Sequence, residues 1–177
     1  EFGNFLLINN FLEEGKDLKL LSSENIGGEI FSFIKKDNFK EINFFIDNSQ
    51  DTLRMLFGFS LKSYQFNNYK SSKKKSELKN INVKSKHFDK IKNNYKELNS
   101  VLSGVNFTRD LVWQPANVLT PKKFSLECKK LIKQGVKVSI FNETKLKKIG
   151  MEALLAVGQG SSQQSYVVVM EWNKGAK

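Results

Sequence analysis

Both prolines of this 177-residue chain lie in one short stretch, Thr108–Pro121, whose sequence is TRDLVWQPANVLTP. Proline restricts the residue before it, so Pro115 biases Gln114 away from helical geometry and predicts the end of an incoming helix. Pro121 follows Thr120 and precedes a periodic apolar run, which predicts a helix with Thr120 as its N-cap and Pro121 at its first position. The stretch therefore predicts two helices joined by a rigid turn.

Upstream of this turn, the spacing of apolar residues alternates between strand and helix patterns. A cap at Ser22 or Ser23 is expected for the first helix, and Gly27 and Gly28 are expected to weaken its first turn. This order predicts an α/β sandwich. Strands are expected at 4–11, 42–47 and 81–84, helices from Ser23 to Ile34 and at 52–63, a polar connection at 12–22 and a solvated loop or fraying linker at 71–75.

The most regular pattern lies at 88–105, where apolar residues recur at steps of three and four. So narrow a stripe predicts a long helix that packs against one other element or crosses between two domains. His87, the only histidine, precedes this helix without a cysteine or an acidic cluster nearby, so no metal site is expected there. The stripe consists of Phe88, Ile91, Tyr95, Leu98, Leu102 and Val105.

Downstream of the turn, a helix is expected at 122–134, with Gly135 ending it in a left-handed conformation. Its inward residues are predicted to be Phe124, Cys128, Leu131 and Ile132. Cys128 is the only cysteine, which excludes an internal disulfide, and in this apolar pattern it is expected to be a buried thiol. The remaining elements expected are a strand at 136–141, a helix at 143–149 capped by Asn142 and ended by Gly150, a buried apolar element at 153–157, a loop at 158–162 and a strand at 165–172.

The net charge of +11 is unevenly distributed along the sequence. Residues 1–61 carry 6 basic and 10 acidic groups, whereas residues 62–96 carry 11 lysines and 2 acids, and residues 122–148 carry 9 lysines and 2 acids. Such basic segments can attract nucleic acid or an anionic membrane. However, 27 of the 29 basic residues are lysine, and sites that read phosphates or bases favour the arginine fork, so an exposed lysine surface is the simpler interpretation.

No complete catalytic constellation is present in the sequence. The metalloprotease helix HExxH, the CxxC pair, the GxSxG elbow and the phosphate loop GxxxxGK[ST] are all missing. The segment 158–161, GQGS, lacks the lysine and the glycine spacing of a phosphate loop and predicts a tight turn instead. Only five carboxylates follow residue 100, and their spacing is not that of metal ligands; they are Asp110, Glu127, Glu143, Glu152 and Glu171.

Two blocks of the sequence resemble the leucyl aminopeptidase (cytosol aminopeptidase) family. The first block is the proline stretch, and the second is GMEALLAVGQGS at 150–161; the segment 64–70, YQFNNYK, and the last strand resemble family segments as well. Two departures stand out: Trp113-Gln114 replaces a polar pair, and the region before Tyr64 is short. The family-motif residues are Arg109, Asp110, Pro115, Asn117, Thr120, Pro121, Gly150, Met151, Gly158, Gly160 and Ser161.

The resemblance implies an α/β fold in three parts. These are a small macro-domain-like α/β N-terminal domain at 1–86, a long linker helix at 87–114, and the first helix–strand–helix–strand of an α/β catalytic domain at 115–177. It also implies a two-metal exopeptidase that removes N-terminal amino acids from peptides, in which two divalent ions (zinc, manganese or magnesium) activate a water and polarise the scissile carbonyl.

The family's metal-binding blocks, GKGxxFDTGG and NTDAEGR, would follow Lys177, and Lys174–Lys177 is not the first of them because no FDTGG follows. We therefore expect no catalytic residue, metal ligand or bound metal in this chain, and we expect it to be inactive alone. The family also implies a cytoplasmic, hexameric enzyme without membrane association. Two alternatives are a non-catalytic module for oligomer assembly or DNA binding, and ADP-ribose binding, for which residues 1–61 offer no glycine-rich loop.

Overall fold

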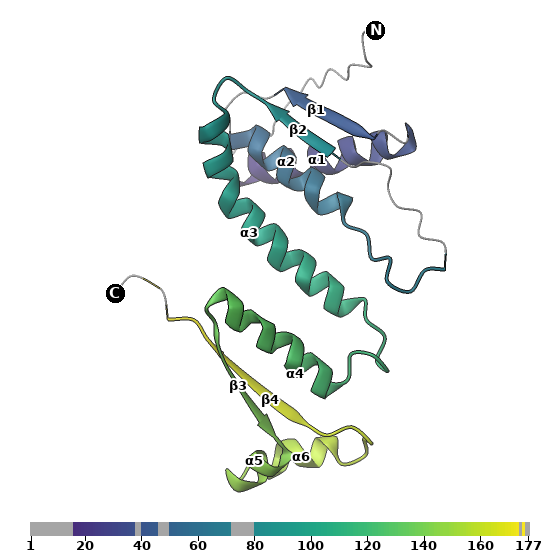
Figure 1. The fold of residues 1–177 in the computed structure, drawn as a ribbon, viewed down its shortest axis with the longest axis vertical. Coiled ribbons are helices and arrows are strands. Elements are labelled where there is room, and N and C mark those ends of the chain that lie inside the picture. Colours follow the sequence, from purple (N-terminus) through teal and green to yellow (C-terminus); the bar gives the residue numbers. More distant parts are fainter. Residues whose placement is uncertain (1–15, 38–39, 46–49, 72–79, 174, 176–177) are drawn as a thin grey trace. The chain divides into compact units, whose positions relative to one another are not determined.

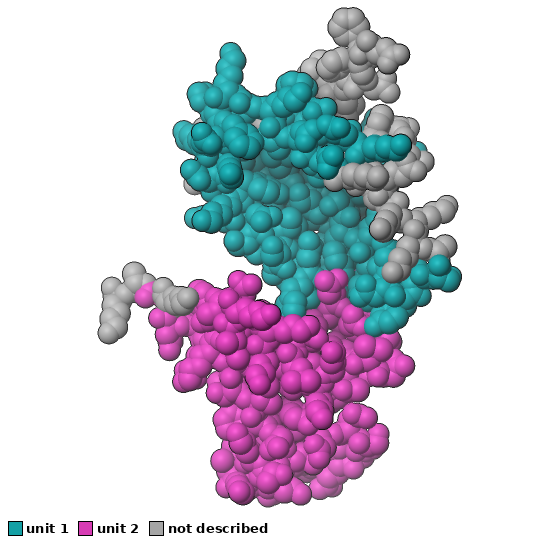
Figure 2. All heavy atoms as spheres, viewed as in Figure 1, with its two compact units in different colours: residues 1–109 teal, residues 110–177 magenta. Residues whose placement is uncertain are grey.

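The computed structural model describes residues 16–37, 40–45, 50–71, 80–173 and 175 (Figure 1). The chain divides into two compact units, residues 1–109 and residues 110–177, which Figure 2 colours separately. Each unit combines helices with a two-stranded sheet, so the expected α/β class is confirmed. The domain boundaries predicted at 86 and 114 stay predictions.

Unit 1 holds three long helices and a parallel strand pair. The pair joins β1 to β2 with Ile42 opposite Ile81 and Phe44 opposite Val83. The strand predicted at 4–11 and most of the loop predicted at 71–75 lie outside the described residues. The elements are α1 (Lys16–Ile34), a 3₁₀ turn (Lys35–Asp37), β1 (Glu41–Phe45), α2 (Gln50–Ser63), β2 (Asn80–Lys84) and α3 (Phe88–Val112), whose last three residues belong to unit 2.

Helices α1 and α2 cross with their backbones in close approach. A Cβ atom added at Gly27 would lie 1.9 Å from the carbonyl oxygen of Met55, and one added at Gly58 would lie 1.9 Å from the carbonyl oxygen of Glu24. At the same crossing the Arg54 guanidinium donates to the Glu24 carboxylate over 2.7 Å. The absence of two side chains therefore allows two backbones to meet where any other residue would force them apart.

The start of α1 corrects the sequence prediction. We expected a polar connection to residue 22 and a cap at Ser22 or Ser23, but the helix begins at Lys16 and Ser23 is completely buried inside it. Gly27 consequently lies in the middle of the helix and not in its first turn. The apolar periodicity of α1 is weak because its inward face includes Ser23 and Gly27. These residues are buried but are not large apolar side chains, so a search for apolar spacing does not detect them.

The core of unit 1 forms between the two helices and one face of the strand pair. Phe59 is fully buried, and the rings of Phe31 and Phe44 both meet it edge to face at centroid distances of 5.2 Å. Ile30 completes the buried cluster. Most outward positions of the strands are polar: the Asn82 amide donates to the carboxylate of Glu41 and, over 3.3 Å, to the side-chain oxygen of Asn43. The sheet thus turns one apolar face to the helices, and its other face is mostly polar but also carries Phe45, which is 69% exposed and whose ring centre lies 5.5 Å from the Lys84 ammonium.

Helix α3 confirms the long helix predicted at 88–105 and extends it to Val112. Within the predicted stripe, Ile91 is buried, and the Tyr95 hydroxyl hydrogen-bonds to Ser60 of α2 over 3.0 Å. Burial raises the pKa of Tyr95 above its usual value. Phe88 is the exception, because it lies half-exposed at the start of the helix.

Unit 2 is built on an antiparallel pair of β3 and β4, with Ile140 opposite Val168 and Lys137 opposite Glu171. Helix α4 contacts the strand pair, and α5 and α6 lie at the end of the pair where β3 ends and β4 begins (Figure 1). The elements are α4 (Pro121–Lys129), a 3₁₀ helix (Lys130–Gln134), β3 (Lys137–Asn142), α5 (Glu143–Lys148), α6 (Glu152–Gly158) and β4 (Tyr166–Glu171).

The elements of unit 2 agree with the predicted order, but several predicted core residues do not. The helix expected at 122–134 changes to 3₁₀ geometry after Lys129. Cys128 is buried as predicted, whereas Phe124 and Ile132 are exposed and Ser125 takes the inward position beside Cys128. In the segment predicted as a buried element at 153–157, only Leu155 is buried. Periodicity marks an apolar face, but only the neighbouring elements decide how much of that face is covered.

Candidate functional site

The family-motif residues begin at the C-terminal half of α3. The Arg109 guanidinium donates a 2.6 Å hydrogen bond to the carbonyl oxygen of Leu61, which is near the end of α2, and lies 5.4 Å from the centre of the Tyr64 ring. Arg109 therefore satisfies one of the carbonyls that a helix end leaves without an intrahelical partner. Asp110 follows on the same helix and is exposed. The sequence carried no signal for the link from Arg109 to Leu61, which is 48 residues distant.

The proline stretch forms the predicted turn and helix start. The carbonyl oxygen of Pro115 accepts from the amides of Val118 and Leu119, both over 2.9 Å, and Asn117 is exposed in this turn. The Thr120 hydroxyl then accepts from the amide of Lys123 over 3.3 Å, and Pro121 occupies the start of α4. Both parts of the local prediction, the helix stop and the capped helix start, are confirmed.

The second motif block begins by ending α5. Gly150 has a φ of 76°, a left-handed conformation that favours glycine. Its amide donates to the carbonyl of Lys147 over 3.1 Å, and the amide of Met151 donates to the carbonyl of Leu146 over 3.0 Å. These two bonds form a Schellman motif, which closes α5 and places Met151 at the start of α6.

The loop that follows α6 is held by contacts with the start of β4. The side chain of Glu143 accepts a 2.9 Å hydrogen bond from the Ser165 amide. A Cβ atom added at Gly158 would lie 2.2 Å from the Ser165 hydroxyl, so the chain passes close to that glycine. The Ser161 amide donates to the Gly158 carbonyl and its hydroxyl accepts from the amide of Gln163, both over 3.0 Å, whereas Gly160 faces open space. The segment 158–161 is thus a tight turn, as predicted.

These contacts place the motif residues on separate elements. Arg109 belongs to unit 1, and the others belong to unit 2, where the first block starts α4 and the second block joins α5 to α6 and β4. The hydrogen bonds described above support backbone turns and helix ends. Arg109, Thr120 and Gly150 make such bonds, and so do Glu143 and Ser165, which the sequence prediction did not single out.

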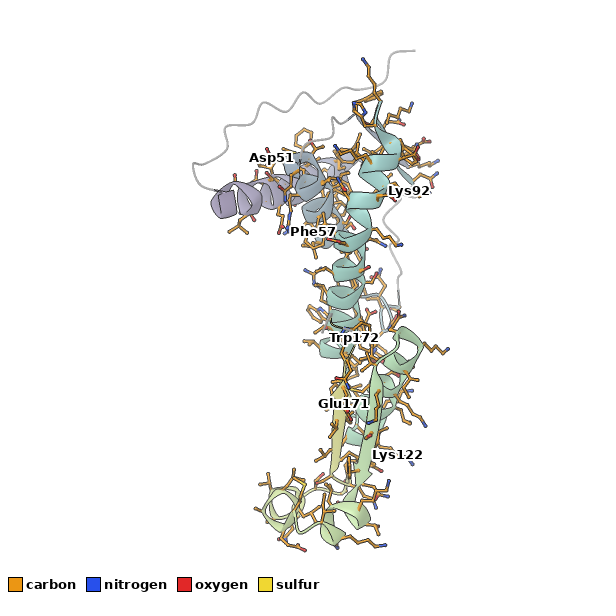
Figure 3. The ribbon with its side chains drawn as sticks, turned by 90° about the vertical axis from the view of Figure 1, so that its left-hand side faces the viewer. Asp51, Phe57, Lys92, Lys122, Glu171 and Trp172 are labelled. Carbon is orange, nitrogen blue, oxygen red and sulfur yellow. The ribbon has the colours of Figure 1, made fainter. Side chains whose placement is uncertain are left out.

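Three carboxylates of unit 2, those of Glu127, Glu143 and Glu171, are engaged with lysines or a backbone amide. Hydrogen bonding to Lys130, at 2.5 Å, and a weaker attraction to Lys123 lower the pKa of Glu127 below its usual value. Glu171, at the end of β4, binds Lys137 over 3.1 Å, and Figure 3 shows it beside Trp172. In the described ranges, no group of three or more histidine, cysteine, aspartate or glutamate side chains is placed to hold a metal ion.

Unit 2 also contains the cysteine of the chain, Cys128, and several exposed lysines. Burial raises the pKa of the Cys128 thiol, which disfavours the nucleophilic thiolate. Several lysines of α4 and α5 are exposed, and Lys145 lies 5.8 Å from the centre of the Phe141 ring. Of the helices that the structure describes, none has the length and apolar character needed to cross a membrane.

Comparison with known proteins assigns this part of the chain to a family. A family model described as the cytosol aminopeptidase family, catalytic domain, matches residues 106–177. A probable cytosol aminopeptidase of Phytoplasma mali is 40% identical over 126 residues, which are 68% of this chain and 25% of that protein. The chain spans only about a quarter to a third of the length of the curated relatives that it matches.

Solved structures agree with this fold. A tomato leucine aminopeptidase variant superimposes with a TM-score of 0.72 at 24% identity, covering 85% of this chain and 32% of the tomato chain. The bottromycin maturation enzyme BotP in complex with Mn gives a TM-score of 0.71 at 19% identity, covering 87% of this chain and 33% of that one. The motif blocks, the family match and the shared fold agree: the chain belongs to the cytosol aminopeptidase family, and residues 106–177 are part of its catalytic domain.

Proposed function

We propose that this chain is a portion of a metal-dependent aminopeptidase that removes N-terminal amino acids from peptides. The observation that carries the proposal is the catalytic-domain match at 106–177, which contains both motif blocks. The geometry supports an architectural contribution, because these blocks end and begin helices around the β3–β4 pair.

The chemistry of the whole enzyme requires two divalent cations, which would activate a water and polarise the scissile carbonyl. BotP has been solved with Mn, which supports a divalent ion in this fold. The described carboxylates of unit 2 form no group of three or more with histidine or cysteine that could hold a metal ion, and three of them are engaged elsewhere: Glu127 and Glu171 bind lysines, and Glu143 accepts from a backbone amide. We therefore propose that the metal ligands come from polypeptide other than the described residues.

A direct assay tests the predicted inactivity. The purified 177-residue chain, supplied in turn with Mn²⁺ and Zn²⁺, is incubated with leucine p-nitroanilide, and the release of nitroaniline is compared with a metal-only blank. We expect no release above the blank. The aminopeptidase of Phytoplasma mali, assayed under the same conditions, is the positive control. Turnover by the isolated chain, lost on adding a chelator, would overturn the proposal that its own residues lack the metal centre.

A second candidate function, DNA binding, is favoured by one observation. Lys90, Lys92 and Lys96 lie exposed on α3 in the lysine-rich segment 62–96. Binding through several phosphates would give a steep decrease of log K with log salt. A titration of a fluorescent duplex between 50 and 200 mM salt measures this slope, and the absence of binding at about 50 mM salt would exclude the idea. Assembly into a hexamer also stays a prediction, and light scattering on the purified chain tests it.

A further inference from the structure

A groove of about 490 Å³ lies in unit 1 between the start of α2 and the start of α3. Its residues on α3, from Lys90 to Leu98, are three or four positions apart along one face of that helix. On α2 the groove is lined by Gln50, Leu53 and Arg54, which share a face for the same reason. The volume falls within the range of sites that bind small molecules.

The contacts that hold α3 on α2 involve other side chains. Ile91 of α3 is buried, and the Tyr95 hydroxyl hydrogen-bonds to Ser60 over 3.0 Å. Further along α3, the Arg109 guanidinium binds the Leu61 carbonyl over 2.6 Å. Both hydrogen bonds reach the second half of α2, so the groove at its start remains open between the two helices.

The lining combines apolar side chains with amides. Leu53 is only 5% exposed, and Leu98 is half-buried. Gln50, Asn93 and Asn94 each supply a side-chain amide that both donates and accepts hydrogen bonds. Each residue of a peptide offers one N–H donor and one C=O acceptor, so these amides can bind a peptide backbone while the leucines contact an apolar side chain.

Opposite charges lie at two positions along the α3 side of the groove. Lys90 and Glu97 are both exposed, and neither forms an ion pair with another described residue. Seven residues of helix from one to the other correspond to about 10 Å along the axis. An extended peptide of three residues also spans about 10 Å. The ammonium group of Lys90 and the carboxylate of Glu97 can therefore bind the two ends of one such peptide.

We propose that this groove binds a short peptide with both ends free, its carboxylate at Lys90 and its ammonium group at Glu97. A zwitterion matches the lining better than a simple anion does, because Glu97 repels anions and Arg54 already binds Glu24 over 2.7 Å. The groove residues precede the segment matched by the catalytic-domain model, so this binding function goes beyond the proposed peptidase function and is tested by binding alone.

Calorimetric titration of the full 177-residue chain with the tripeptide alanyl-leucyl-alanine tests the proposal. EDTA is present, so that metal-dependent hydrolysis does not contribute to the heat. We expect one-to-one binding. Acetylation of the peptide's amino end, or amidation of its carboxyl end, should each weaken binding about three- to tenfold, since ion pairs exposed to solvent contribute modestly.

Two variants assign the two ends of the peptide. Lys90→Gln should abolish the preference for the free carboxylate over the amide, and it should keep the preference for the free ammonium group. Glu97→Gln should do the reverse. The matched control is Lys92→Gln, which removes an exposed lysine of α3 that does not line the groove and should keep both preferences. Circular dichroism of each variant checks its fold.

The absence of tripeptide binding at concentrations up to about 10 mM would overturn the proposal. So would variants at Lys90 and Glu97 that leave both end preferences intact. Equal weakening by Lys92→Gln would assign the effect to the overall charge and not to the groove. Equal affinity for free leucine would overturn a peptide in favour of a single amino acid as the ligand.

Discussion

Individual residues of unit 1 are constrained by backbone proximity more than by chemical function. Gly27 and Gly28 are adjacent, yet their surroundings differ. A Cβ atom at Gly27 would lie 1.9 Å from the Met55 carbonyl oxygen, whereas one at Gly28 would lie 3.8 Å from the Lys62 side chain, an ordinary contact. The pair therefore offers a test of the helix crossing in which each variant is a control for the other.

We predict that Gly27→Ala lowers the free energy of unfolding by roughly 3 kcal/mol, because the added methyl group would force the two helices apart. Gly28→Ala should be neutral or stabilise by about 0.5 kcal/mol, since alanine favours a helix and the added methyl group would make only ordinary contacts. Urea denaturation followed by circular dichroism measures both. Equal effects of the two variants would show that the close crossing of α1 and α2 does not form in solution.

Glu127 supports a pH-dependent prediction at the same scale. Its pKa is lowered in the folded state by Lys130, so the carboxylate stabilises the fold above the pKa of the unfolded chain, and this contribution is lost as the pH falls through the lower folded value. We expect Glu127→Gln to cost less than about 1 kcal/mol at pH 7, because both lysines are largely exposed.

The difference between wild type and Glu127→Gln should shrink as the pH is lowered below about 4. Thermal unfolding at a series of pH values gives this difference directly. Repeating the measurement at about 1 M salt is a useful control, since screening should reduce the effect at pH 7. A difference that grows toward acid would contradict the assigned ion pairs.

At the scale of the elements, helix ends are the best-specified features of unit 2. The side chains of Thr120 and Asn142 each accept a hydrogen bond from a backbone amide at the start of a helix. Gly135 and Gly150 end helical segments with φ values of 89° and 76°. These arrangements involve residues within a few positions of each other, so the residue types alone predict them.

Gly150→Ala should destabilise the chain by about 1 kcal/mol, because alanine is strained in the left-handed conformation even though open space surrounds the position. Gly104→Ala, in the interior of α3 and equally open, should stabilise by about 0.5 to 1 kcal/mol. Comparison of the two melting temperatures tests whether backbone conformation is the cause. A stabilising effect of both alanines would contradict the Schellman end of α5.

At the scale of the molecule, the two units differ in how completely their sheets are covered. The β1–β2 pair of unit 1 packs Phe44 against Phe59 on one face, and its other face carries polar side chains and the exposed Phe45. The β3–β4 pair of unit 2 exposes Val169 and Met170 on opposite faces. Helix side chains therefore cover one face of the parallel pair in unit 1, whereas the antiparallel pair in unit 2 keeps exposed apolar side chains on both faces.

We predict that the isolated chain binds the dye ANS through exposed apolar side chains of unit 2, of which Val157 is 89%, Met170 52% and Val169 41% exposed. Val157→Lys and Val169→Lys together should reduce the dye fluorescence by about half or more, whereas Val101→Lys should change it little. Fluorescence titration at fixed protein concentration measures the effect. An equal reduction by the unit 1 variant would assign the dye to another surface.

Turn, cap and helix-end residues predicted the structure of this protein more reliably than the periodicity of apolar residues did. The turn at Pro115, the cap at Thr120 and the end of α5 at Gly150 depend on neighbours in the sequence, and all three are confirmed. The predicted burial of Phe124 and Ile132 failed, since an apolar face records what a helix can bury and not what covers it. The predicted start of α1 was wrong because serine and glycine at a close helix crossing do not contribute to the periodicity of apolar residues.

The sequence by itself determined the order of most elements, the helix ends and the two motif blocks that identify the family, because each depends on residues close together in the chain. Only the tertiary structure decided the roles of Gly27, Arg109 and Glu143. Their partners lie 28, 48 and 22 residues away, respectively, at Met55, Leu61 and Ser165. Contacts between such distant residues are set by how helices and strands pack, which no local pattern of residue types encodes.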